Sequence, residues 1–324
     1  MSLGAKAVLS IMVFSLIVLF LASLLVGALG IGVPGELAST VIRLRLLRGL
    51  LAISVGGLLG LAGLLTQYSV SNLLATPDIL GVLQGAFTAS IIVAIVYRGS
   101  PPLGAPVLAG FLGGLAAYAL TTLLASRLGF TGSGLVLAGI AVASMLAGAS
   151  TLLTFLAQVL AGLNASLLLL GTFAYATETR VLIAYATLLA SVIVTALSAR
   201  GLDALSYGDE AAASMGFSPR RVRLVATGVA ALASSVTVYA AGIVYFVSLM
   251  APNAARLLLG GHPSRTIPGS ILVGALIALG ADIATRLIGL ATGGGEIPSG
   301  LVTTIIGGAF LAYILLKIGV GEAP

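Results

Sequence analysis

The residues best suited to chemistry in this sequence lie close together in an otherwise apolar chain. Seven of the 24 charged residues fall in one stretch, and they are Arg200, Asp203, Asp209, Glu210, Arg220, Arg221 and Arg223. Arginine side chains bind carboxylates and phosphates through paired hydrogen bonds. The spacing therefore predicts a charged segment that contacts an acidic partner or lipid phosphates, with an ordinary solvated loop as the alternative.

Catalytic and metal-binding chemistry finds little support elsewhere. There are no cysteines, and the single His262 cannot build a zinc site with other histidines. Neither of the two lysines, Lys6 and Lys317, follows a glycine, so a phosphate-binding loop that ends in Gly-Lys is excluded. We therefore predict no metal site, no ATP hydrolysis by that route and no enzyme activity in this chain. The basic balance comes from only 15 scattered Lys and Arg, and we predict no binding of nucleic acid.

The elements that position this charged segment must lie in lipid. The chain is 59% hydrophobic and only 7% charged, with a mean hydropathy of +1.21. Soluble domains carry roughly 25% charged residues, so this chain has too little polar surface to cover a globule in water. The composition predicts a multi-pass membrane protein of all-α fold, with residues 1–324 forming a single transmembrane domain.

About ten transmembrane helices follow from apolar runs of roughly 20 residues. The predicted spans are 7–31, 48–68, 79–97, 103–126, 134–160, 181–199, 222–247, 248–260, 266–290 and 298–318. The run at 248–260 is short for a crossing, and we interpret it as a half-helix joined to its neighbour through Pro252; whether it crosses is left open. Ten spans place both termini on the same side.

Loop charges favour both termini in the cytoplasm, because Lys and Arg accumulate there. This orientation places the charged segment inside and the cluster at Arg43, Arg45 and Arg48 outside, against the rule. A shift of 175 residues superposes Arg45 on Arg220 and Arg48 on Arg223. The sequence thus predicts two five-helix halves that insert with opposite orientation, as in many transporters.

Two carboxylates, Asp78 and Asp282, fall near the ends of predicted spans. Ionisable groups inside a membrane often mark a proton or ion pathway, which would fit a secondary transporter driven by an ion gradient. Asp282 also precedes Arg286 by four residues, so a local ion pair is the simpler interpretation. An intramembrane enzyme would need a catalytic pair, and the sequence shows none.

Six motifs, one of them within the charged segment, allow a more specific interpretation of the chain. They are LSYGDEAAASMGFSPRRVRL (205–224), RLLRGLLAISVGGLLGLAGLLTQ (45–67), NLLATPDILGV (72–82), LVLAGIAV (135–142), ADIATR (281–286) and GEIPSGLVTTIIGGAFLAYILL (295–316). Together they resemble the FecCD-like permeases, the membrane subunits of type II ABC importers for cobalamin, haem, iron–siderophores and, in some members, molybdate. The sequence departs from the family pattern at Leu47, Tyr207, Asp209, Asn253 and Ala309.

The resemblance implies a homodimer with its pathway along the dimer axis. Two separate ATPase subunits would carry ATP and magnesium on the cytoplasmic face, and a substrate-binding protein would dock on the outer face of the cell membrane. Within 205–224 it implies two short coupling helices. The residues that would contact the ATPase are Gly208, Asp209, Glu210, Ala211, Ala212, Ser214, Met215, Gly216, Arg220 and Arg221.

The resemblance also implies two further sites. Arg45, Arg48 and Arg286 match positions that pair with carboxylates of the binding protein; the alternative is pairing within the chain, with Asp282 as the obvious partner for Arg286. The pathway and its inner gate would be lined by Thr131, Gly132, Ser133, Ser144, Met145, Gly148, Thr151 and Leu152. Simple packing of small residues between helices is the alternative for the pathway. The sequence does not identify which substrate is carried.

Overall fold

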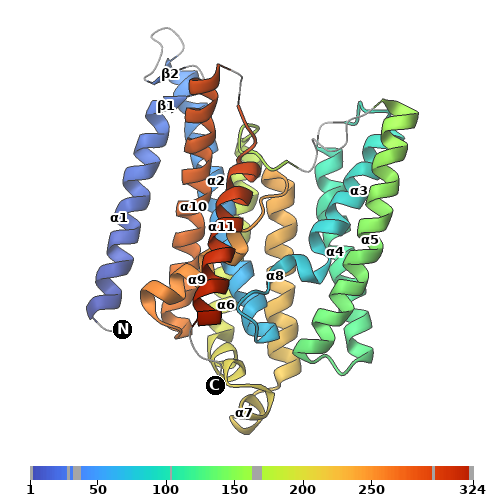
Figure 1. Cartoon of the computed structure of the whole chain (residues 1–324), viewed down its shortest axis with the longest axis vertical. Coiled ribbons are helices and arrows are strands. Elements are labelled where there is room, and N and C mark those ends of the chain that lie inside the picture. Colours follow the sequence, from blue (N-terminus) through green and yellow to red (C-terminus); the bar gives the residue numbers. More distant parts are fainter. Residues whose placement is uncertain are drawn as a thin grey trace.

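The computed structural model describes residues 3–27, 30–31, 38–102, 104–162, 170–293 and 296–320. Almost all of this part of the chain is helical (Figure 1). Its α-helices are α1 (Leu3–Leu25), α2 (Ala38–Val70), α3 (Val82–Val96), α4 (Ala105–Arg127), α5 (Gly132–Ala161), α6 (Glu178–Ser206), α7 (Asp209–Ser214), α8 (Pro219–Ala241), α9 (Val247–Leu259), α10 (Pro263–Thr292) and α11 (Ser299–Val320). A 3₁₀ turn, η1 (Pro77–Leu80), precedes α3, and a two-residue hairpin pairs β1 (Val26–Gly27) with β2 (Gly30–Ile31).

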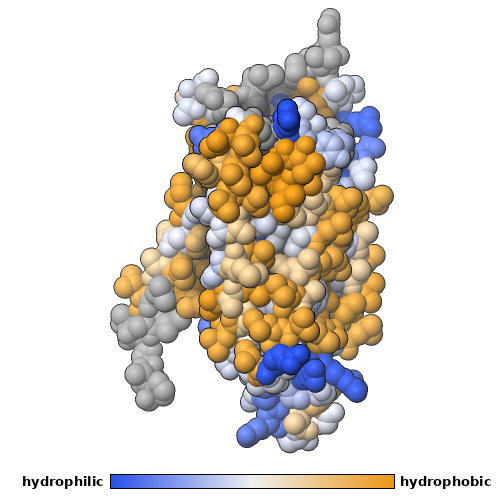
Figure 2. Space-filling model, turned by 90° about the vertical axis from the view of Figure 1, so that its right-hand side faces the viewer, coloured by the Kyte–Doolittle hydropathy of each residue, from blue (hydrophilic) through white to orange (hydrophobic). Residues whose placement is uncertain are grey.

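Seven of these helices are long and apolar enough to cross a membrane: α1, α2, α4, α5, α6, α8 and α10. Figure 2 shows a broad hydrophobic face with hydrophilic residues gathered at its lower end. In water such a surface would be costly, at about 25 cal/mol per Å² of exposed apolar area. The all-α, multi-pass membrane fold expected from composition is confirmed.

Each of the ten predicted spans coincides with a helix, but two of the helices are short. α3 has 15 residues and α9 has 13, which at 1.5 Å per residue gives about 22 and 20 Å, less than the roughly 30 Å of a hydrocarbon core. Helix α11 has 22 residues, and its stretch 299–314 is apolar. The span predicted at 7–31 extends past α1, which ends at Leu25, and crosses residues outside the described part.

The predicted joint at Pro252 is wrong. Pro252 lies inside α9, and the chain leaves α8 at Gly242 and re-enters a helix after Phe246. Phe246 has a φ of 66°, in the left-handed region that non-glycine residues seldom adopt. The break therefore lies at this backbone turn, while Pro252 costs α9 one backbone hydrogen bond without ending it.

Helix α2 lies at the centre of the fold and packs against α6, α8, α9 and α10. Its apolar side chains, such as Leu58, Leu61 and Leu65, are buried in the largest core cluster. Glycines allow this close approach: a Cβ at Gly60 would lie 2.1 Å from the backbone oxygen of Ser270 in α10. A second group of helices, α3, α4 and α5, stands at one side of the molecule (Figure 1).

The two ends of the molecule carry different elements. The start of α1, the last turns of α11 and the short helix α7 lie at the lower end in Figure 1, and the β1–β2 hairpin lies at the upper end. Helix α2 begins at the upper end and α8 at the lower end, so these two helices run in opposite directions. This antiparallel arrangement agrees with the inverted repeat expected from the matching arginines.

Candidate functional site

The charged segment folds as one short helix between two long ones. Gly208 precedes α7 with a φ of 104°, and Gly216 follows it with a φ of 83°, conformations that glycine adopts at little cost. The two short coupling helices implied by the resemblance are not both present in this described segment, because Leu205 still belongs to α6 and α8 begins at Pro219. Pro219 suits the first position of α8, because the amide hydrogen that proline lacks would have no partner inside the helix there.

One face of α7 is anchored and the other is free. Ala212 is fully buried with Ala204 and Leu205 of α6, and Phe217 packs against them. Among the residues that would contact an ATPase, Glu210, Ser214, Met215, Gly216, Arg220 and Arg221 are exposed, whereas Gly208, Asp209 and Ala211 are half-buried. The free face combines the small residues Ala213 and Ser214 with Glu210, and α7 lies at the lower end of the molecule (Figure 1).

The three clustered arginines have different roles. Arg220 and Arg221 are exposed, whereas Arg223 is only 3% exposed. Its Nη2 lies 2.6 Å from Oδ1 of Asp209, its Nε donates to the backbone oxygen of Ser69 at 2.5 Å, and its Nη1 donates to the backbone oxygen of Phe130 at 3.3 Å. Arg223 therefore connects α7, the end of α2 and the loop between α4 and α5.

The predicted gate lies in that loop and the first turn of α5. Phe130 has a φ of 55° and is buried. Thr131 is the N-cap of α5, and its hydroxyl accepts a hydrogen bond from the amide of Gly134 at 3.1 Å. A Cβ at Gly132 would meet the backbone of Val70 at 3.3 Å, so the start of α5 packs directly on the end of α2. Ser133 is exposed beside Thr131.

Replacing Thr131 with alanine should destabilise the start of α5. An N-cap hydroxyl satisfies an amide that has no partner inside the helix, and its loss typically costs about 0.5–2 kcal/mol. Thr131→Ser keeps the hydroxyl and serves as the control. Hydrogen exchange at the amide of Gly134 should speed up in the alanine variant and stay near wild type in the serine variant. Equal protection in both variants would show that the cap contributes nothing.

The predicted pathway residues share one face of α5. Ser144, Met145, Gly148, Thr151 and Leu152 are all exposed. Their spacing of three and four residues places them in a stripe along the helix, and α5 stands at the outer edge of the helix group in Figure 1. This face carries no charged side chain.

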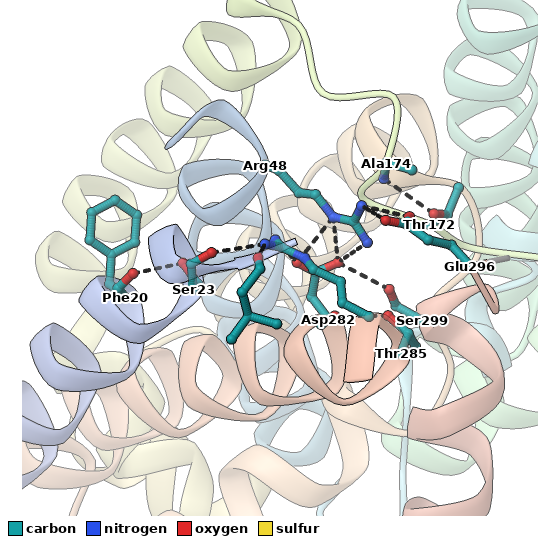
Figure 3. Close-up of polar contacts among 11 residues, drawn as sticks. Phe20, Ser23, Arg48, Thr172, Ala174, Asp282, Thr285, Glu296 and Ser299 are labelled. Atoms are coloured by element: carbon teal, nitrogen blue, oxygen red, sulfur yellow. Dashed lines mark hydrogen bonds and ion pairs between the residues drawn. The ribbon is translucent and has the colours of Figure 1, made fainter. Parts of the chain in front are cut away.

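At the other end of the molecule, Asp282 is the centre of a buried charge cluster (Figure 3). It lies in the interior of α10, further from the helix end than the sequence indicated, and is fully buried. The Nε of Arg48 lies 2.8 Å from Oδ1 of Asp282, and its Nη1 lies 2.6 Å from Glu296. The second carboxylate oxygen of Asp282 pairs with Arg286, as expected from their spacing. Two arginines thus share one buried carboxylate.

Arg286 and a third arginine, Arg45, bind the end of α1. Arg286 donates to the backbone oxygens of Ser23 and Val26, both at 2.9 Å. Arg45 donates to the backbone oxygens of Leu24 and Leu25, at 2.8 and 3.0 Å. The last carbonyls of a helix have no partner inside it, so these guanidinium groups stabilise the C-terminal turn of α1.

The three arginines expected to dock a binding protein are therefore mostly engaged within the chain. Arg45, Arg48 and Arg286 are 8%, 9% and 1% exposed. The pairing of Arg286 with Asp282 follows the alternative interpretation. Docking through these side chains stays a prediction. Sequence reasoning missed Glu296 as a partner of Arg48, and it missed the exposed pair between Arg43 and Glu178, at 2.5 Å.

Known proteins are similar in sequence to nearly the whole chain. The model of the FecCD transport family matches residues 10–317. The ferric enterobactin transport system permease protein FepG of Escherichia coli is 31% identical over 284 residues, which cover 88% of this chain and 84% of FepG. The hemin transport system permease protein HmuU of Yersinia pestis is 30% identical over 280 residues, 85% of this chain and 83% of HmuU.

A solved structure gives the same result for the fold. An inward-facing metal-chelate type ABC transporter superposes with a TM-score of 0.84 at 26% identity, covering 97% of this chain and 99% of that one. The sequence motifs, the helix arrangement and the full-length matches agree, and the chain belongs to the FecCD transport family.

Proposed function

We propose that this chain is the permease subunit of a binding-protein-dependent ABC importer that moves a metal chelate into the cytoplasm. The relatives FepG and HmuU are named as permeases for ferric enterobactin and for hemin, and this supports a metal chelate as the class of substrate. A cobalamin, haem or iron–siderophore would each fit it, and molybdate is a related candidate. Two copies of the chain would form the pathway between them.

The observation that carries this proposal is the geometry of α7. It is a short helix at one end of the molecule, with Glu210, Ala213 and Ser214 exposed, and Arg223 connects it to the loop before α5. Such a helix can sit close to a partner surface and pass its movement into the membrane. Two ATPase subunits that bind ATP and magnesium would provide that surface, and this chain itself would hold no cofactor.

The exposed stripe on α5 would line the pathway. Ser144, Thr151 and Gly148 provide small, weakly polar surface, and Met145 and Leu152 are both 59% exposed. A wall without fixed charge would let a bulky chelate pass without binding it tightly. Thr131, Gly132 and Ser133 would close this wall at its inner end.

The outer end would bind the substrate-binding protein. Arg45, Arg48 and Arg286 would meet its carboxylates, but they would do so in competition with Asp282, Glu296 and the end of α1. With the start of α1, the last turns of α11 and α7 at one end, we place that end in the cytoplasm and the β1–β2 hairpin outside the inner membrane.

Changing the free face of α7 should separate the permease from its ATPase. Ser214→Arg adds a long cation to an exposed position, so the fold should survive while the ATPase no longer co-purifies. Tyr175→Arg, at an exposed position beside the start of α6, is the matched control and should keep the ATPase. The measurement is the amount of ATPase retained on the purified permease.

Reconstitution into liposomes with the ATPase and binding protein would then identify the substrate. Hydrolysis should rise when the binding protein carries its ligand, and ferric siderophores, haem, cobalamin and molybdate should be compared in parallel. If no ATPase associates with the wild-type chain and an ion gradient alone drives uptake, the chain works as a secondary transporter and the proposal is wrong.

A further inference from the structure

We propose that Arg223 is a positioning residue that transmits the position of the coupling helix α7 to the inner gate before α5. This inference rests on the proposed function, because it assigns the physical connection between ATPase and gate to one side chain. Arg223 itself is buried and lies beneath the surface that a partner could touch. It acts through Asp209 on one side and Phe130 on the other.

The guanidinium has a different kind of partner in each direction. Toward α7 it makes an ion pair with both carboxylate oxygens of Asp209, at 2.6 and 3.2 Å. Toward the membrane it donates to two backbone oxygens, those of Ser69 and Phe130. The planar guanidinium holds these donors in a fixed geometry. A shift of Asp209 must therefore either break the ion pair or move the other two contacts.

The ion pair is placed where a partner could change it. The side chain of Asp209 is 44% exposed, although Arg223 is 3% exposed. Asp209 is the first residue of α7, whose remaining turn carries the exposed face. An ATPase that pulls or tilts α7 would thus displace the one member of the pair that can move into water.

The loop on the other side has little freedom to absorb such a shift. Phe130 is 4% exposed, packs with Val70 and Leu135, and holds a left-handed backbone conformation. Gly132 lies against the backbone of Val70. Because a tightly packed loop moves as a unit, displacement of the Phe130 carbonyl would carry Thr131 and Ser133, the predicted gate.

The chain offers a clean way to test this, because it has no cysteines. Ser133→Cys introduces a single exposed thiol in the gate. Its rate of reaction with a membrane-impermeant maleimide would be measured in the assembled transporter in liposomes, once without nucleotide and once with the ATPase trapped by ATP and vanadate. The wild-type background should show two clearly different rates.

Asp209→Asn should reduce this difference. The asparagine keeps the shape of the side chain but removes the charge, and a hydrogen bond loses much of its strength when its acceptor is no longer ionised. We expect the ratio of the two labelling rates to fall about fivefold to tenfold, together with substrate moved per ATP hydrolysed. Asp203→Asn removes the same charge from the end of α6, outside the coupling contacts, and should keep the wild-type ratio.

Arg223→Lys provides the second variant. Lysine keeps the charge but cannot bind Asp209 and two carbonyls through a planar fork, so it should also uncouple hydrolysis from gate movement. Wild-type labelling ratios and transport per ATP in Asp209→Asn would overturn the inference even if Arg223→Lys failed to fold. Failure of the proposed function looks different: the ATPase would then not associate with the wild-type chain at all.

Discussion

Replacing Asp282 with alanine is expected to lower the free energy of unfolding by about 3–5 kcal/mol, the usual cost of removing one partner from a buried ion pair. Asp282 is fully buried and accepts from two guanidinium groups, those of Arg48 and Arg286. Without it, Arg286 keeps only backbone carbonyls of the α1 end, and Arg48 keeps Glu296. The unfolding curve should be measured by denaturant titration in mixed micelles.

The control for Asp282 lies at the same end of the molecule. Glu178→Ala breaks an ion pair with Arg43 in which both side chains are about two-thirds exposed. Water and salt screen such a pair, and its loss should not measurably move the unfolding curve. If Asp282→Ala also left the curve unchanged, the cluster would contribute nothing to the stability of the fold, and the arginines would be free to serve a docking partner.

Sequence alone predicted the helices well because lipid imposes a strict requirement. A chain that crosses a bilayer must form its backbone hydrogen bonds within each span, so each span is a helix. The side chains of such a helix are mostly apolar, and the resulting long apolar runs are visible in the sequence. The charged segment at 205–224 was recognised in the same way, since it interrupts those runs. The number of short helices in this segment was not predicted correctly, because residues at both of its ends continue the long helices α6 and α8.

The contacts of the arginines could not be predicted in this way. Arg48 and Asp282 are 234 residues apart in the chain, and no spacing pattern in the sequence predicts a pair so distant. Several acceptors are backbone oxygens, such as those of Ser69 and Phe130, which exist at every residue and leave no trace in the sequence. Pairing four residues apart on one helix is local, and Arg286 with Asp282 was accordingly expected.

Arg48 and Arg223, two buried arginines that match across the repeat, differ in the burial of their partners. Arg48 and Arg223 are separated by 175 positions in the sequence and lie on helices of opposite direction. Each pairs with a carboxylate from another helix, Asp282 or Asp209. Asp282, the partner of Arg48, is fully buried, whereas the side chain of Asp209, the partner of Arg223, is 44% exposed. Of these two pairs, only that of Arg223 and Asp209 is therefore open to displacement by a protein that binds at its end of the molecule.

Replacing Gly63 with alanine should destabilise the fold through the contact between α2 and α9. An added Cβ would lie 1.8 Å from the backbone oxygen of Ser248, a distance that only a backbone shift can relieve. Overpacking of this kind typically costs about 1–3 kcal/mol and occasionally more. Alanine in a helix interior would by itself gain about 0.5–1 kcal/mol over glycine, so a net loss of stability requires the steric term to exceed that gain.

Gly308→Ala in α11 is the control, because the same substitution there should not lower the stability of the fold. A Cβ there would meet no atom within 4 Å in the described chain, so only the gain in helix propensity remains, and the variant should be as stable as wild type or slightly more so. The two variants should thus shift the unfolding midpoint in opposite directions, although the chemical change is the same. A stabilised Gly63→Ala would mean that α9 can move away from α2 at little cost, as a half-helix joined at a backbone turn would if it were a moving part of the pathway.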